Sequence, residues 1–171
     1  DASYPKPIAP FVFNPWNTDP AMLPSDVAMQ APDGDKHVVF FSPQGAQADK
    51  WLISPLIDIY DGYELKVTAK SYIDMYNEKM EFAVSETGSD NPDDFVVLSN
   101  AQNIPSDQWT VYSTDLAPYA GKKVRLAVHY TSTDAFFAQL DLFKAAPADG
   151  SNVQKDYGNV LHYNNDIDGT K

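Results

Sequence analysis

The chain has 171 residues, of which 43% are hydrophobic and 13% aromatic, and its formal net charge is −12 at pH 7. These values predict one folded domain with a short extension and exclude wholesale disorder. The acidic balance argues against nucleic acid as a partner, because phosphate binding needs clustered Lys and Arg. The absence of cysteine excludes disulfides, zinc–thiolate sites and a cysteine nucleophile. No apolar run approaches the ~20 residues of a membrane span, so we expect no membrane insertion, and the opening Asp1-Ala2-Ser3 predicts a mature or trimmed start.

The N-terminal third is rich in proline and aromatic residues. Seven prolines between residues 5 and 32 forbid a long helix there. Phe11-Val12-Phe13 predicts a short strand, and residues 15–32 predict an ordered loop or short turns.

From His37 onward, short apolar segments alternate with turn residues. Leu65, Val67 and Ala69 alternate with polar neighbours, a period of two that is typical of half-buried strands. The predicted strands of this region occupy residues 38–41, 51–59 with an interruption at Pro55, 65–69, 80–84, 95–98, 109–112, 124–130 and 135–143. About eight short strands without helices between them predict an all-β antiparallel sandwich or barrel, and the missing crossover helices argue against parallel βαβ units.

The composition changes after Lys144. Small and turn-forming residues at positions 145–152 predict a linker, and the remaining segment, residues 153–171, is too short to form its own core. We therefore expect a domain at residues 1–145 and a linker with a C-terminal extension at residues 146–171. The segment from Val160 to Lys171 resembles the first strand pair of a fibronectin type III module, which implies the start of a following module.

Three segments carry a resemblance when they are taken in order. Residues 49–59 read DKWLISPLIDI, Trp109 is followed by the run YAGKKV at residues 119–124, and residues 139–143 read QLDLF. Together they resemble the cleaved-adhesin and choice-of-anchor J domains of Bacteroidetes, which include the haemagglutinin-adhesin modules of gingipains. The resemblance covers residues 36–145.

The resemblance implies a jelly-roll β-sandwich of the concanavalin and galactose-binding type, often calcium-bearing, in a secreted or anchored multidomain protein. Two positions depart from the family pattern. Trp16 is followed only by Asn17-Thr18-Asp19, where the family often carries an acidic, glycine-containing loop, and Asp141 is followed by Leu142 instead of a second acid or Asn. Both departures weaken the case for a complete metal site.

The chain carries no recognisable catalytic motif. A nucleophile elbow, a phosphate-binding loop and a zinc-protease helix motif are all missing. Acid–base catalysis needs two carboxylates at a fixed separation; Glu64 and Glu81 fall on the predicted solvent faces of strands, which favours a solvated surface. His129 lies in a predicted strand, where a satisfied or exposed histidine is the simpler interpretation.

Aromatic residues divide into two predicted groups. Trp51 and Trp109 fall within the resemblance, and we expect them to pack in the core. Trp16 lies in a proline-rich loop among polar neighbours, where it could stack on a sugar or pack over a sandwich edge. Tyr72, Tyr76 and Asn77 cluster at a predicted hairpin, so Trp16 and these three residues are our candidate ligand-binding residues.

A calcium site is the second candidate. Asp33 and Asp35 flank a glycine before the first core strand, and Asp141 lies in the last strand. First and last strands of a jelly roll often neighbour each other, so these acids could converge, and calcium prefers six to eight oxygen ligands. An Asp-Gly-Asp sequence is also an ordinary turn, so both interpretations stay open.

The sequence therefore predicts a non-catalytic extracellular binding or adhesion module of a bacterial surface or secreted protein. We expect a monomer at the outer membrane or outside a Gram-negative cell, with a glycan or a host surface protein as its partner. A structural spacer and a hydrolase of glycans or proteins are the alternatives, because a fold alone does not determine function.

Overall fold

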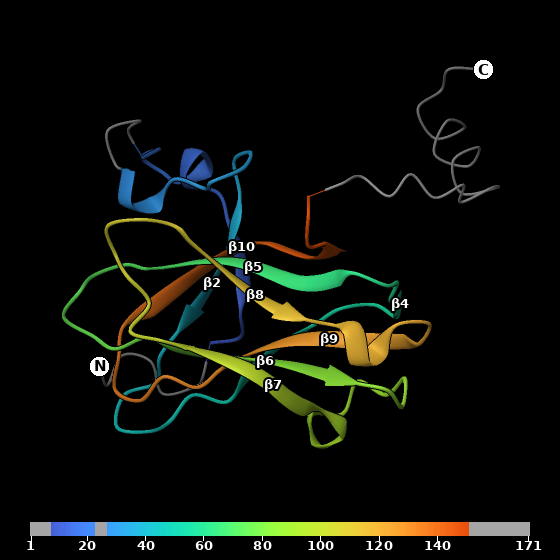
Figure 1. Cartoon of the computed structure of the whole chain (residues 1–171). Helices are drawn as coiled ribbons and strands as arrows, with labels where there is room; N and C mark the ends of the chain where they lie inside the picture. The colour runs from blue at the N-terminus through green and yellow to red at the C-terminus, as the bar shows by residue number, and fades with distance from the viewer. Residues whose placement is uncertain (1–7, 23–26, 151–171) are drawn as a thin grey trace.

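A computed structural model describes residues 8–22 and 27–150, and these residues form two antiparallel sheets packed face to face (Figure 1). The first sheet has the order β1 (Phe11–Phe13), β2 (His37–Phe41), β10 (Phe137–Pro147), β5 (Tyr63–Ser71) and β8 (Thr110–Asp115). The second has the order β3 (Lys50–Ile53), β9 (Lys123–Tyr130), β6 (Lys79–Ser85) and β7 (Val96–Gln102), and β4 (Ile57–Asp58) also pairs with β9. The connections contain four short 3-10 turns, η1 (Pro15–Asn17), η2 (Val27–Met29), η3 (Pro92–Asp94) and η4 (Ala117–Tyr119).

The core lies between the sheets and follows the period of two in the sequence. Leu65, Val67 and Ala69 point inward from β5, and Leu126 and Val128 meet them from β9; all five are buried. Alternate residues of a strand face opposite sides of the sheet, so their polar neighbours face outward. The predicted all-β antiparallel jelly-roll sandwich is confirmed.

Proline sets one strand break as the sequence predicts. Pro55 separates β3 from β4, and both strands pair with β9, at Ile53↔Ala127 and Ile57↔Val124. Proline cannot donate to a ladder, so the pairing stops at Ser54, whose hydroxyl accepts a hydrogen bond from the Leu126 N–H at 2.9 Å. The interruption therefore divides this edge into two segments, and both remain paired with β9.

The last strand is longer than predicted. β10 pairs with β5 as far as Pro147↔Tyr63, with an irregularity between Asp141 and Lys144. Residues 145–147, which we assigned to the end of the domain and the start of a linker, therefore belong to the sheet. The fibronectin-like segment from Val160 to Lys171 lies outside the described residues, and its assignment stays a prediction.

A short segment covers the outer face of the first sheet. Figure 1 shows η1 and η2 on the side of β5 and β10 that faces away from the second sheet. Met29 packs there against Val39 and Phe137 in a second, small hydrophobic cluster. We call residues 27–35 the covering segment, because they bury side chains that the sandwich alone would leave exposed. No helix in the described residues has the length and apolar character to cross a membrane.

Candidate functional site

Six aromatic rings gather at the end of the sandwich where β5 ends and β10 begins. The ring centroids of Tyr72 and Phe137 lie 4.6 Å apart, and those of Phe136 and Phe137 lie 4.9 Å apart. Each ring has a neighbour in the group within 6.3 Å. We call this group the aromatic patch, and its members are Phe11, Phe41, Tyr72, Tyr76, Phe136 and Phe137.

The aromatic patch is open to solvent. Phe11, Tyr72, Tyr76 and Phe136 are 39%, 38%, 36% and 40% exposed, and Met75, between the two tyrosines, is 77% exposed. Contiguous exposed apolar surfaces are uncommon on soluble proteins and often mark interaction sites. Tyrosine adds a hydroxyl beside its apolar ring, and this combination suits recognition.

A buried carboxylate holds the patch in place from below. Glu78 is fully buried, and one of its oxygens accepts hydrogen bonds from the hydroxyls of Tyr130 at 2.6 Å and Ser132 at 2.7 Å. Its other oxygen accepts from the backbone N–H of Phe136 at 3.0 Å. Burial and the neighbouring Glu78 carboxylate raise the pKa of Tyr130 far above its usual range, so this phenol stays a donor. Glu78 thereby joins the loop that carries Tyr72 and Tyr76 to the loop that carries Phe136.

The structure brings together two of the four predicted ligand-binding residues. Tyr72 and Tyr76 both contact Phe136. Asn77 has a structural task in the same loop, since its side-chain oxygen accepts from the backbone N–H of Asn103 at 2.8 Å. Trp16 lies half-buried in η1, capped by Asn14, and no recorded ring contact within the described residues joins it to the patch.

The two tryptophans that we expected in the core lie on the outer faces of the sheets. Trp51 is half-buried and stacks on His129 with ring centroids 3.9 Å apart, and its indole N–H donates to Asp49. Trp109 is half-buried under the covering segment and donates from Nε1 to the Gln30 carbonyl at 2.9 Å. The core assignment was therefore wrong, because an aromatic residue in a strand motif can be covered from the outside as well as from the inside.

His129 is a satisfied strand histidine, as the sequence favoured. Its Nδ1 lies 2.9 Å from Glu81, and its Nε2 lies 2.9 Å from Asp49. Both ring nitrogens are therefore engaged, and the Trp51 ring covers one face of the imidazole. This arrangement fixes the outer face of the second sheet and leaves no free imidazole nitrogen for catalysis.

The covering segment buries a group of polar side chains on the outer face of the first sheet. His37, Gln139 and Asp141 each contain a buried atom without a hydrogen-bond partner in the described residues. Burial, and then the charge of Lys70, lower the pKa of His37 to about 4. Burial also lowers the pKa of Lys70, an effect that the charge of Asp107 partly opposes. We call these four residues, His37, Lys70, Gln139 and Asp141, the polar cluster.

Two of the three predicted calcium ligands come together. Burial raises the pKa of Asp141; a backbone hydrogen bond from Asp33 works against this shift, and the charge of Asp33 adds to it. Asp33 and Asp141 are therefore close, as the jelly-roll argument predicted. Asp35 is exposed, and among the described residues no group of three or more His, Cys, Asp or Glu could hold a metal ion. Any cation here would need backbone carbonyls and water beside the two carboxylates.

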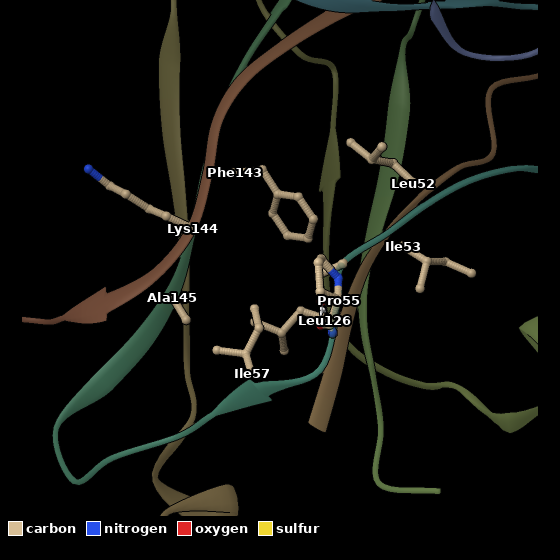
Figure 2. Close-up of a pocket in the computed structure, with 9 residues that line it drawn as sticks. Leu52, Ile53, Pro55, Ile57, Leu126, Phe143, Lys144 and Ala145 are labelled. Atoms are coloured by element: carbon tan, nitrogen blue, oxygen red, sulfur yellow. Dashed lines mark hydrogen bonds between the residues drawn. The ribbon is translucent and has the colours of Figure 1, made fainter. Parts of the chain in front are cut away.

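A pocket opens at the other end of the sandwich, and the sequence did not indicate it. It measures about 290 Å³ and lies between β3, β4 and the last part of β10. Figure 2 shows the Phe143 ring pointing from β10 towards Pro55, while the Lys144 side chain points the other way. Leu52, Ile57 and Leu126 complete an apolar lining. With few polar groups to orient a ligand, this pocket is poorly suited to sugars.

Comparison with known proteins gives structural neighbours only. No family model and no curated protein matches the chain. The K2 cleaved adhesin domain of Lys-gingipain superposes with a TM-score of 0.60 at 21% identity, over 82% of this chain and 84% of that one. The K1 cleaved adhesin domain of Lys-gingipain from Porphyromonas gingivalis W83 gives 0.57 at 18% identity, over 81% and 98%. The chain shares their fold.

The same fold occurs in a sugar-binding protein. The carbohydrate-binding module TmCBM61, solved in complex with beta-1,4-galactotriose, gives a TM-score of 0.55 at 13% identity, over 81% of this chain and 82% of that one. The resemblance to cleaved adhesin domains that the sequence indicated is therefore found again in three dimensions. At these identities the similarity establishes the fold, and function has to be argued from the site.

Replacing Glu78 with Ala should lower the free energy of unfolding by about 3–5 kcal/mol, because three buried donors lose their acceptor. Glu64→Ala is the matched control: its carboxylate is partly exposed and lies 3.7 Å from Lys66, so its loss should cost under about 1 kcal/mol. Urea unfolding of both variants measures the difference. Equal losses would contradict the role assigned to Glu78.

The depressed pKa of His37 predicts a specific pH dependence. Above pH 6.5 the ring is neutral in both folded and unfolded chains, so it contributes nothing; between pH 6.5 and about 4 only the unfolded chain takes up the proton. This difference should remove up to about 3 kcal/mol of stability as the pH falls through that window. When unfolding is measured from pH 7 to 4.5, the stability of the wild type relative to His37→Leu should fall steadily as the pH is lowered, whereas parallel curves would refute the assignment.

Proposed function

We propose that this chain is a non-catalytic binding module of a secreted or surface-displayed bacterial protein, and that it recognises glycan through the aromatic patch. The observation that carries this proposal is the set of four exposed rings at one end of the sandwich, each 36–40% exposed. Loops at the end of a rigid sandwich are a common place for recognition. The support from Glu78 keeps the rings in position before a ligand arrives, which lowers the ordering cost of binding.

The glutamates of the chain favour binding over catalysis. Glu64 and Glu86 pair with lysines, Glu81 pairs with His129, and Glu78 is saturated with donors. A glycosidase needs two carboxylates facing one bond across a cleft. None of these four glutamates is arranged in that way, which supports the non-catalytic proposal.

The neighbour TmCBM61 gives the first ligand to test, since it was solved with beta-1,4-galactotriose. Galactose presents several C–H groups on one face, and such a face suits an aromatic surface that contains phenylalanine as well as tyrosine. We therefore propose galactose-containing glycans as the first class of ligand. A host surface protein remains the alternative partner.

Tyr76→Ala and Phe136→Ala should each weaken binding to β-1,4-galactan by at least about tenfold, the equivalent of 1.4 kcal/mol. Tyr60→Ala is the matched control, because Tyr60 is also 36% exposed but lies before the opposite end of β5. Affinity electrophoresis followed by a glycan array measures the effect. The three variants should have similar thermal midpoints, so that a change in binding reports on the site.

Two outcomes would overturn the glycan proposal. If the wild-type protein binds no glycan on the array, the module acts as a spacer or binds protein. If it binds glycan and the Tyr76 and Phe136 variants bind equally well, the site lies elsewhere.

We also propose that Asp33 and Asp141 hold a structural calcium ion. Asp141 has one carboxylate oxygen that is buried without a partner in the described residues, and the other accepts from the Leu142 N–H at 2.7 Å. A cation would neutralise two acids that otherwise repel each other. The ion would link the start of β2 to β10 and leave the aromatic patch untouched.

After treatment with chelator, millimolar calcium should raise the thermal midpoint, because an ion at a hundred times its dissociation constant stabilises the folded state by about 2.7 kcal/mol. Asp141→Asn keeps an oxygen for the Leu142 N–H but loses the charge, and should abolish the shift. Asp61→Asn, in a distant exposed turn, should keep it. An unchanged midpoint in the wild type, with no calcium found by elemental analysis, would remove the ion from the proposal.

A further inference from the structure

Lys70 and Gln139 face each other across two central strands of the first sheet. The register pairs Gln139 of β10 directly with Lys70 of β5, and directly opposite residues have Cβ atoms about 4.5–5.5 Å apart. Both side chains belong to the polar cluster on the outer face. Both are buried, with Gln139 at 0% and Lys70 at 5% exposure.

Among the described residues, the Gln139 amide lacks one partner that its burial calls for, and the Lys70 amine opposite is not hydrogen-bonded to it. The Gln139 amide donates from Nε2 to the Ala28 carbonyl at 3.1 Å, but its Oε1 atom has no partner in the described residues. The Lys70 amine forms no hydrogen bond or ion pair within the described residues, and the charge of Asp107 raises its pKa against the effect of burial. A buried polar group without a partner destabilises the fold, so native structures normally satisfy such groups.

The surroundings shield the pair from most of the solvent, which makes it easier for the lysine amine to lose its proton than in water. Trp109 directly precedes Thr110, which pairs with Ala69, so it lies beside Lys70 at the edge of the pair. Its indole is fixed to the Gln30 carbonyl of the covering segment. Burial lowers the pKa of Lys70, and an uncharged lysine amine is a nucleophile.

We propose that Lys70 and Gln139 become joined by an intramolecular isopeptide bond. Lys70 Nζ attacks Gln139 Cδ, the Nζ–Cδ bond forms, and the Cδ–Nε2 bond breaks. The side-chain nitrogen of Gln139 leaves as ammonia and takes up the proton that the lysine ammonium gives off, so the products are one amide and one ammonium ion. The exchange of one amide for another needs no oxidant, reductant or added reactant.

The site contains a candidate donor for the oxygen that becomes negative during the attack. His37 lies on β2, the other neighbour of β10, and neither of its ring nitrogens has a partner in the described residues. A neutral imidazole keeps one N–H, and His37 is a diagonal neighbour of Gln139, two residues from its direct partner Val39. The bond would replace the Lys70 amine and the Gln139 amide with a single uncharged secondary amide. It would also link β5 to β10 covalently.

The experiment is the intact mass of the purified, folded chain. The wild type should weigh less than its sequence by one ammonia, and tandem mass spectrometry of a digest should recover a branched peptide pair that contains both Lys70 and Gln139. Lys70→Arg and Gln139→Leu should each have the mass of their sequence. Lys66→Arg, which changes an earlier lysine on the same face of β5, should still show the loss.

The branched peptide distinguishes the bond from ammonia lost elsewhere, such as at an asparagine. Thermal unfolding gives a second measurement, because the linked chain should melt at a higher temperature than Gln139→Leu. A folded wild-type chain at its full sequence mass, unchanged after prolonged incubation, would overturn the proposal. So would a mass loss that persists in Lys70→Arg.

Discussion

Glu78 is a fully buried carboxylate that receives three hydrogen bonds, from Tyr130, Ser132 and the backbone of Phe136. In a low-dielectric interior, a hydrogen-bond network with a missing partner destabilises the fold. The loops at this end therefore keep the one arrangement in which all three hydrogen bonds to Glu78 form. Tyr130 anchors the network to the core, where its ring packs on Phe40. The hydrogen bonds to Glu78 therefore hold the exposed rings of the aromatic patch in position, and Tyr130 connects this network to the core of the sandwich.

The two ends and the two outer faces of the sandwich differ in chemistry. One end carries the aromatic patch, and the other carries an apolar pocket beside Phe143. On the second sheet, the two ring nitrogens of His129 are hydrogen-bonded to Glu81 and Asp49, and the Trp51 ring stacks on the imidazole. On the first sheet, the covering segment buries polar groups that lack partners in the described residues. Within residues 8–22 and 27–150, the buried polar atoms without partners all belong to the polar cluster. We place the chemistry of the molecule there and its recognition surface at the exposed rings.

The sequence predicted the strands well, because a period of two needs only local information. Leu65, Val67 and Ala69 could be placed in the core without knowledge of their partners, and Pro55 could be placed at a break. The tryptophans were misplaced, because burial of Trp51 and Trp109 comes from outside the sandwich, through His129 and the covering segment. The aromatic patch was half found. The sequence does contain a signal for its phenylalanines. Consecutive residues of a strand face opposite sides of the sheet, so in Phe40-Phe41 and in Phe136-Phe137 only one of the two rings can face the core.

The position of β10 has a mechanical consequence. It pairs antiparallel with β2 on one side and β5 on the other, so a force along this strand acts across both ladders at once. The hydrogen bonds of an antiparallel ladder lie perpendicular to the strands. A force along β10 therefore loads all of these bonds at the same time, in shear, whereas peeling would break them one after another. A domain built in this way resists extension along its last strand far better than peeling at an edge such as β1. That anisotropy is compatible with the surface-displayed binding module proposed above.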